Sequence, residues 1–277
     1  MTRLRISAIS YLNTAPLMWD FEHGNAGRDF DISYTLPSAC ARALQAGTAD
    51  IGIIPAAAYA QIPELKVLPG VAIASRRAVR SILLVSKLPI QEIRTVALDN
   101  SSLTSVALTK ILFEKWLGGR KVYSSMPPDL EKMLAACDAA LLIGDPALQV
   151  ERFRYVTLDL AEEWIRYTGK PFVFAFWAVR AEAVEGAASQ DLAALFQRSR
   201  DHGLEVANLD LISRQWAPRL GISEASVHAY LTENIHYWLD AACIDGLRLF
   251  YHCAAEVGAL SSVPAINFLN SPKPCIA

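Results

Sequence analysis

The segment ISAISYLNTAPL, residues 6–17, places a short apolar run directly before a turn that is rich in small polar side chains. The run Ile6–Ile9 predicts a buried strand, and Ser10, Asn13 and Thr14 follow at its carboxyl end. Because ligands in open α/β sheets bind outside the carboxyl ends of the strands, we expect a ligand site at this turn.

Length and charge restrict the class of protein. The chain has 277 residues, 53% of them hydrophobic, and chains beyond ~250 residues tend to divide their core into two lobes. The 26 basic and 28 acidic residues give a net charge of −2 without a basic stripe, so nucleic acid and anionic membranes are not expected partners. The N-terminus lacks an apolar signal-peptide core, and no run of ~18 apolar residues occurs. We therefore expect a cytoplasmic protein that does not span a membrane.

Cysteines, histidines and short motifs exclude several kinds of site. The five cysteines are scattered without a CxxC pair, which favours reduced thiols and neither a disulfide framework nor a zinc site. The five histidines form no HExxH motif, and we assign none of them a role. No GxGxxG, Walker-type or GxSxG motif occurs, so nucleotide-binding and serine-hydrolase functions lack support.

The predicted strands and helices fall into two blocks, followed by a helical region. Short apolar runs between turn signals suit parallel strands that are covered on both faces. The first block has strands at 4–9, 31–36 and 50–54 and a helix at 39–46 that ends at Gly47. The second block has strands at 95–98 and 139–143 and a helix at 103–116. From residue 181 the chain is predicted to be helical, most strongly over 224–239 and 241–254, with a loose tail at 271–274.

Two extended segments, Ser81–Ser86 and Phe172–Ala178, connect the blocks. Two crossings between lobes form a hinge beside a cleft, which is the plan of periplasmic-type binding proteins and a preferred place for ligands. We predict an α/β fold with two lobes, of the periplasmic binding protein type II kind, whose C-terminal helices pack on the first lobe. Residues 1–86 and 178–277 would form the first lobe, and residues 87–177 the second.

Four hydroxyl side chains crowd the strand-to-helix turn DNSSLTS, residues 99–105. The first turn of a helix offers unpaired N–H groups and the positive end of the dipole, and Ser101, Ser102, Thr104 and Ser105 would add donors for a carboxylate or phosphate. Ordinary capping needs only one such residue, so we favour anion binding over capping alone.

Ser38 and Asp145 each allow two interpretations. Ser38 opens the helix of the first block, where it could serve as a structural cap or as a ligand donor that faces the cleft. Asp145 follows a buried strand and precedes Pro146, a pattern typical of a helix N-cap. Its carboxylate could instead lie at the cleft as a base or an orienting group. Trp164 most simply packs in the core.

The pattern Ser-Tyr-Leu-Asn-Thr-x-Pro-Leu resembles the N-terminal signature of the chorismate dehydratases of the futalosine route to menaquinone. Segments 37–55, 99–112, 142–148 and 159–177 are also similar to that family, which often has Arg where this chain has Leu103. The resemblance implies a hydro-lyase that converts chorismate to 3-[(1-carboxyvinyl)oxy]benzoate and water without a metal or organic cofactor. It implies Asn13 as a catalytic residue and the following substrate-binding residues: Ser10, Ser38, Ser81, Ser101, Ser102, Thr104, Ser105, Gly144 and Asp145.

The implied chemistry needs orientation more than a strong base. Chorismate carries two carboxylates, and Ser38 and residues 101–105 could supply one anion site in each lobe. The proton could go to Asp145, if burial shifts its pKa, or to the substrate's own enolpyruvyl carboxylate, which we favour. Asn13 would stabilise developing charge or orient the leaving hydroxyl. The alternative functions are a 1,4-dihydroxy-6-naphthoate synthase-like enzyme of the same pathway and a non-catalytic solute-binding protein for small anions.

Overall fold

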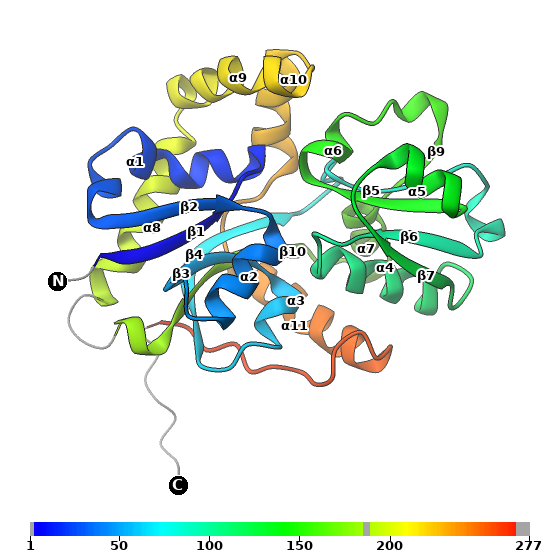
Figure 1. Cartoon of the computed structure of the whole chain (residues 1–277), viewed down its shortest axis with the longest axis horizontal. Coiled ribbons are helices and arrows are strands. Elements are labelled where there is room, and N and C mark those ends of the chain that lie inside the picture. Colours follow the sequence, from blue (N-terminus) through cyan, green and yellow to red (C-terminus); the bar gives the residue numbers. More distant parts are fainter. Residues whose placement is uncertain (1–2, 185–188, 270–277) are drawn as a thin grey trace, which may run out of the picture.

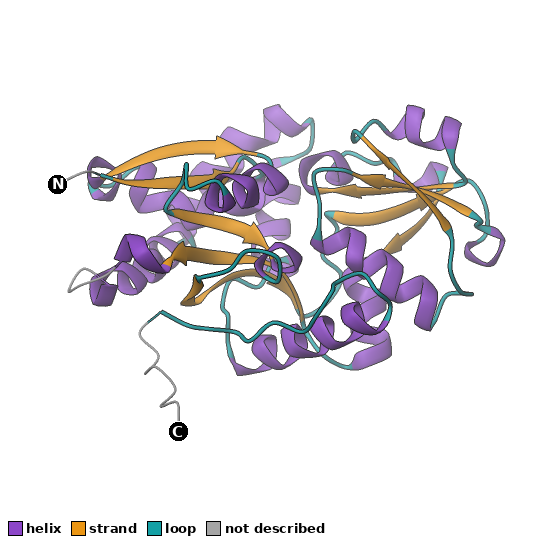
Figure 2. Ribbon diagram, turned by 60° about the horizontal axis from the view of Figure 1, so that its bottom comes forward, coloured by secondary structure: helices purple, strands orange, loops and turns teal. Residues whose placement is uncertain are grey.

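Short buried strands form two sheets of five strands each, as the pattern of apolar runs predicts. The computed structural model describes residues 3–184 and 189–269, in which each sheet is the centre of one lobe (Figure 1). Helices flank both sheets, and the two lobes lie side by side (Figure 2). The predicted two-lobed α/β architecture is therefore confirmed.

The first sheet has the strand order β2–β1–β3–β10–β4. Its strands are β1 (Leu4–Ile9), β2 (Phe30–Thr35), β3 (Ile51–Pro55), β4 (Leu65–Ser75) and β10 (Phe172–Arg180). β1 pairs in parallel with β2 and β3, but β10 runs antiparallel to β3 and β4, so the sheet is mixed and not wholly parallel. α2 (Pro37–Gln45) and α3 (Ala56–Tyr59) follow β2 and β3. Gly47 follows α2 with a φ of +69°, as expected after a helix C-terminus.

The second sheet has the strand order β7–β6–β8–β5–β9. Its strands are β5 (Ile82–Ser86), β6 (Thr95–Asp99), β7 (Val122–Met126), β8 (Ala139–Ile143) and β9 (Val156–Asp159). Its helices are α4 (Thr104–Lys115), α5 (Leu130–Ala136), α6 (Gly144–Leu148) and α7 (Leu160–Thr168). β5 is antiparallel to both of its neighbours, so this sheet is mixed as well. Trp164 of α7 is fully buried, in agreement with its expected place in the core.

The chain crosses between the sheets one strand earlier than expected at each crossing. β5 is hydrogen-bonded within the second sheet and β10 within the first, so the crossings are residues 76–81 and 169–171. An extended apolar run does not reveal which sheet it will join, and this ambiguity explains the difference from the expected boundaries. The Asp159 carboxylate holds the first crossing, because it accepts hydrogen bonds from the N–H groups of Val79 and Arg80 at 3.1 and 2.6 Å.

The C-terminal region forms α8 (Ser189–Gly203), α9 (Val206–Leu220), α10 (Glu224–Ala229) and α11 (Ala241–Glu256). The helix predicted over 224–239 was wrong beyond Asn234, where a π-helical turn, Tyr230–Asn234, ends. Ile235, Tyr237 and Leu239 are buried in alternation with more exposed residues, which is the period of a strand. This segment pairs with the end of β4, since the backbone groups of His236 and Ala74 exchange two hydrogen bonds.

Short segments complete the described chain. They are α1 (Trp19–Glu22) and the 3-10 helices η1 (Leu12–Met18), η2 (Ala26–Asp29), η3 (Ile90–Glu92), η4 (Arg152–Arg154) and η5 (Ala181–Val184). No helix among the described residues is both long and apolar enough to cross a bilayer. Cys40, Cys137, Cys243 and Cys253 are buried free thiols, as expected. Cys275 and the tail at 271–274 lie outside the described residues.

Candidate active site

A cavity of about 50 Å³ lies between the two sheets, where β1 and β3 end. Both lobes contribute to its wall, which is mainly apolar with a few hydroxyl and amide groups. The lining residues are Ile9, Tyr11, Asn13, Pro37, Pro55, Ile73, Ile82, Ser102, Thr104, Ser105, Ile143, Gly144, Phe174 and Ala175. Five of the ten predicted site residues are among them: Asn13, Ser102, Thr104, Ser105 and Gly144. A concave site that combines apolar walls with a few convergent polar groups is the usual form of a small-molecule site.

Direct hydrogen bonds hold the two lobes together around this cavity. The Ser38 N–H donates to the Ser101 carbonyl at 3.1 Å, so the starts of α2 and α4 meet backbone to backbone. The Thr104 hydroxyl accepts from the Ala57 N–H at 3.1 Å and donates to the Phe174 carbonyl at 3.0 Å. These contacts describe a closed arrangement of the lobes, in which Ser38 lies in the first turn of α2 and not at its N-cap.

Asn13 lies in η1, within the signature segment, and its half-buried side chain lines the cavity. The Tyr230 hydroxyl donates to the Ser81 hydroxyl at 2.9 Å and is also within hydrogen-bonding reach of the Asn13 side chain. Burial raises the pKa of Tyr230 above its ordinary value, so this phenol stays protonated and can act as a donor. The Ser81 side chain therefore lies behind Asn13 and is linked to it through the Tyr230 hydroxyl.

The hydroxyls of residues 101–105 combine structural and cavity-lining positions. The Ser102 hydroxyl accepts from the Ser105 N–H at 3.2 Å and so satisfies one of the unpaired N–H groups at the start of α4. Ser102, Thr104 and Ser105 line the cavity, whereas the Ser101 hydroxyl donates to the Asp99 carboxylate at 2.6 Å. The turn thus builds the start of α4 and presents three hydroxyl side chains to the cavity.

Asp145 lies within the first turn of α6 and does not cap it, because the helix begins at Gly144. Its carboxylate accepts a hydrogen bond from the Leu12 N–H at 3.0 Å, which joins the second lobe to the signature segment. Burial raises the pKa of Asp145 to about 6, although the Leu12 N–H opposes this shift. The prediction of a carboxylate beside the cleft is consistent with this position, whereas the N-cap interpretation was wrong.

Tyr11 belongs to the signature segment and lines the cavity, although its residue type alone predicts no role. Its ring lies against Gly144, where an added Cβ atom would come within 2.6 Å of two ring carbons. Burial raises the pKa of Tyr11 to about 12, and the Ser101 hydroxyl is placed to hydrogen-bond the phenol. Behind Ser101, Asp99 is fully buried, and its second carboxylate oxygen has no hydrogen-bond partner among the described residues. Tyr230 gave no signal in the sequence, because nothing in a helical stretch shows which side chain reaches a distant cavity.

Ser10 is separated from the other predicted residues. Its side chain is exposed and lines a neighbouring pocket of about 280 Å³, outside the cavity between the sheets. The two hollows share Ile9 and Tyr11 as walls.

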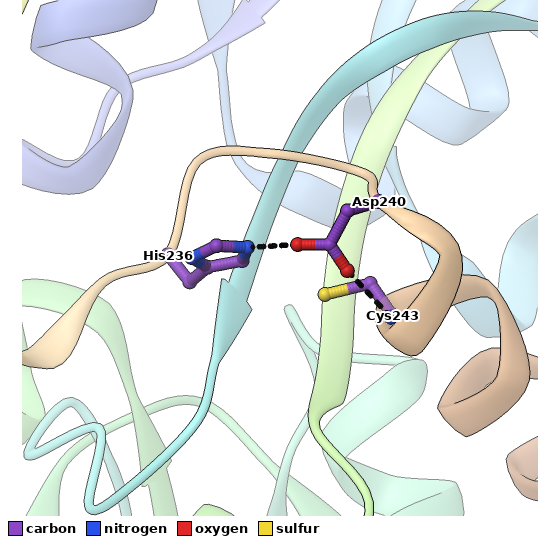
Figure 3. A group of neighbouring side chains, drawn as sticks. All are labelled: His236, Asp240 and Cys243. Atoms are coloured by element: carbon purple, nitrogen blue, oxygen red, sulfur yellow. Dashed lines mark hydrogen bonds and ion pairs between the residues drawn. The ribbon is translucent and has the colours of Figure 1, made fainter.

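One group of side chains among the described residues has metal-ligand spacing: His236, Asp240 and Cys243 (Figure 3). Asp240 caps α11 by accepting from the Cys243 N–H at 3.0 Å, and it also pairs with Arg76 at 2.5 Å and His236 at 2.7 Å. Although burial opposes the shift, these partners lower the pKa of Asp240 to about 2. Burial raises the pKa of the Cys243 thiol to about 12. A metal would have to displace Arg76 and deprotonate this thiol. The three side chains therefore fit a hydrogen-bonded cluster beside the first crossing, residues 76–81, better than a metal centre.

Comparison with known proteins agrees with this architecture. The profile of a family described as menaquinone biosynthesis matches residues 4–256. A chorismate dehydratase from Thermus thermophilus is 30% identical over 258 residues, which cover 87% of this chain and 91% of that protein.

Solved structures share the fold at low sequence identity. Protein AF1704 from Archaeoglobus fulgidus superposes with a TM-score of 0.75 at 16% identity, over 93% of this chain and 98% of that one. The alkanesulfonate-binding protein SsuA from Xanthomonas axonopodis pv. citri superposes with a TM-score of 0.69 at 16% identity, over 97% of this chain and 96% of that one. The fold is thus that of the periplasmic binding proteins, as predicted. The match of the family profile along most of its length shows that this chain belongs to the menaquinone biosynthesis family.

Proposed function

We propose that this protein is a chorismate dehydratase, which converts chorismate to 3-[(1-carboxyvinyl)oxy]benzoate and water. The observation that carries the proposal is the small cavity between the closed lobes, to which Asn13 contributes from one side and the start of α4 from the other. The Thermus thermophilus relative of that name supports the choice of substrate. The cavity of about 50 Å³ is smaller than a cyclic dicarboxylate, so substrate must bind as the lobes separate and reclose.

The reaction removes a ring proton and the adjacent hydroxyl group, and the ring becomes aromatic. The electrons of the broken C–H bond form the new ring double bond, and the hydroxyl leaves as water after it takes up a proton. Because aromatisation drives the reaction forward, the protein has mainly to hold the substrate and stabilise developing charge. Asn13 and the hydroxyls of Ser102 and Ser105 are placed at the cavity wall for this task.

We infer that the enolpyruvyl carboxylate of the substrate accepts the ring proton, and that Asp145 serves to close the lobes. The Asp145 carboxylate already accepts a hydrogen bond from the Leu12 N–H, and Asp145 is not among the residues that line the cavity. A carboxylate carried by the substrate itself needs no separate base, provided that the lobes fix its position.

The pH dependence of Asp145→Asn distinguishes the two possible bases. If Asp145 is the base, activity of the wild type should fall below pH about 6, where its carboxylate takes up a proton. We expect no such limb between pH 5 and 8, and we expect Asp145→Asn to retain activity within about threefold, because the amide oxygen can still accept from Leu12. A pH limb near 6 that disappears in the variant would identify Asp145 as the base.

The raised pKa of Asp145 also predicts how the stability of the protein depends on pH, and Asp145→Asn tests this prediction. The pKa of Asp145 in the folded protein, about 6, is higher than its ordinary value of 3.8, so the folded state binds this proton more tightly than the unfolded state. Its contribution to the free energy of unfolding is therefore present at low pH and lost as the pH rises toward 6. In melting curves, Asp145→Asn should lack this decrease.

The need for two carboxylates can be tested by thermal stability. A ligand that contacts both lobes stabilises the folded state by RT ln(1 + [L]/Kd), about 2.7 kcal/mol at 100 times Kd. We expect 3-[(1-carboxyvinyl)oxy]benzoate to raise the melting temperature well above the effect of benzoate at equal concentration. Ser102→Ala should reduce the difference, whereas Ser226→Ala, a half-buried position on α10 that does not line the cavity, should not. Equal stabilisation of the native protein by both compounds would contradict a clamp with one anion site per lobe.

A further inference from the structure

The pocket of about 280 Å³ beside the cavity has the chemistry of a second ligand site. It lies between η1, β2 and α9, and its wall combines aromatic, apolar and charged side chains. The lining residues are Ile9, Ser10, Tyr11, Thr14, Ala15, Met18, Glu22, Tyr34, Gln215, Trp216 and Arg219. We propose that this pocket binds a cyclic carboxylate and is the outer site through which the substrate reaches the inner cavity.

A single face of α9 supplies the groups that would hold the anion. Gln215, Trp216 and Arg219 are spaced at i, i+1 and i+4, so their side chains share one side of the helix. The Arg219 guanidinium lies over the Trp216 ring, 5.3 Å from its centre, and forms no ion pair or hydrogen bond within the described part of the chain. A guanidinium that is oriented by an aromatic ring and has its donors available binds a carboxylate through two parallel hydrogen bonds.

The remaining wall suits the ring of such a ligand. Ile9, Ala15 and Met18 give an apolar surface next to the indole of Trp216. Glu22 is the only acidic residue in the lining, and its carboxylate accepts a hydrogen bond from the Tyr34 hydroxyl. The volume is near the lower end of the roughly 300–1,000 Å³ typical of small-molecule sites and exceeds that of the inner cavity.

Tyr11 separates this pocket from the cavity. It lines both hollows, and its ring rests on Gly144 of the second lobe. At the end of α9, the Gln149 side chain donates to the Leu220 carbonyl at 3.2 Å, so the pocket wall is also tied to the second lobe. Separation of the lobes would withdraw Gly144 from Tyr11 and open a passage between the two hollows. This arrangement also explains why Ser10 lies in the outer pocket while Asn13 lies in the inner cavity.

Benzoate is the probe for the pocket, and Arg214 provides the matched control. Arg214 is an exposed arginine on the same helix that does not line the pocket. We expect benzoate to quench the fluorescence of Trp216, identified by its loss in Trp216→Phe, and Arg219→Gln to weaken this binding at least tenfold. Arg214→Gln should bind benzoate as the wild type does. Equal quenching in Arg219→Gln and the wild type would overturn the carboxylate site.

Steady-state kinetics test whether the pocket lies on the path of the substrate. This part of the inference rests on the proposed function, whereas the benzoate titration does not. For chorismate, Arg219→Gln should raise KM about tenfold and leave kcat unchanged, because an outer site acts before the chemical step. An unchanged KM together with lost benzoate binding would overturn the role in substrate access. If the wild type does not turn over chorismate, the proposed function fails and the titration still decides whether the pocket binds a carboxylate.

Discussion

Replacement of Asn13 by alanine should lower the turnover of chorismate by about a hundredfold or more while leaving the protein folded. The side chain lines the cavity at the end of β1, within reach of the Tyr230 hydroxyl, which is itself bonded to Ser81. A polar group held in this way is oriented before the reaction begins, and loss of one such group typically costs about 10²–10³ in rate. Steady-state kinetics with chorismate measure the effect.

Two controls separate catalysis from folding in this experiment. Asn25→Ala removes an exposed asparagine before η2 whose side chain makes no capping hydrogen bond, so its activity should equal that of the wild type. The melting temperature of Asn13→Ala should remain close to that of the wild type, because Asn13 is only half-buried. A folded Asn13→Ala protein with full activity would remove Asn13 from the mechanism.

Gly144→Ala should reduce kcat/KM more than tenfold, because it obstructs closure of the lobes. Gly144 has a φ of +62°, which L-residues with a side chain rarely adopt, and its Cβ atom would come within 2.6 Å of the Tyr11 ring. Relief of the contact would force Tyr11 away from Ser101 or move α6 away from η1. Either movement would disturb the cavity, which Tyr11 and Gly144 both line.

Gly169→Ala isolates the contribution of backbone strain. Gly169 has a similar φ of +66°, and an added Cβ atom there would meet no atom within 4 Å. This variant should therefore lose roughly 1 kcal/mol of stability, as expected for a left-handed alanine, and keep its activity. Gly144→Ala should show the same strain together with the loss of activity. If the two variants match in activity as well as stability, the contact of Tyr11 with Gly144 does not matter for closure.

The sequence predicted the parts of the fold that depend on local patterns. Apolar runs bounded by turn signals identified β1, β6 and β8, and Gly47 identified the end of α2. Strand β4 was missed because Pro69 and Gly70 interrupt its pattern, although the chain stays extended through them. The prediction of a helix beyond Asn234 was wrong because buried residues there alternate with more exposed ones, which is the period of a strand.

The site shows the same division between local and long-range information. The signature turn and the hydroxyl-rich turn were found because each concentrates polar residues at the end of a strand. The pairing of Leu12 with Asp145 joins residues 133 positions apart, and no local pattern predicts it. The shift in the pKa of Asp145 follows from burial between the lobes, which only the tertiary structure supplies. For the same reason, the positions of Tyr230 behind the cavity and of Arg219 in the outer pocket could not be predicted from the sequence, because they depend on how the C-terminal region packs.

Incubation of the purified protein with chorismate is the most direct test of the proposed function. We expect the absorbance of the cyclic diene to decay in proportion to protein concentration. Mass spectrometry should identify a product lighter by one water, with the aromatic spectrum of 3-[(1-carboxyvinyl)oxy]benzoate. The Asn13→Ala protein should form this product about a hundredfold more slowly. Chorismate that binds to the folded protein and is recovered unchanged would contradict the account and favour a solute-binding protein.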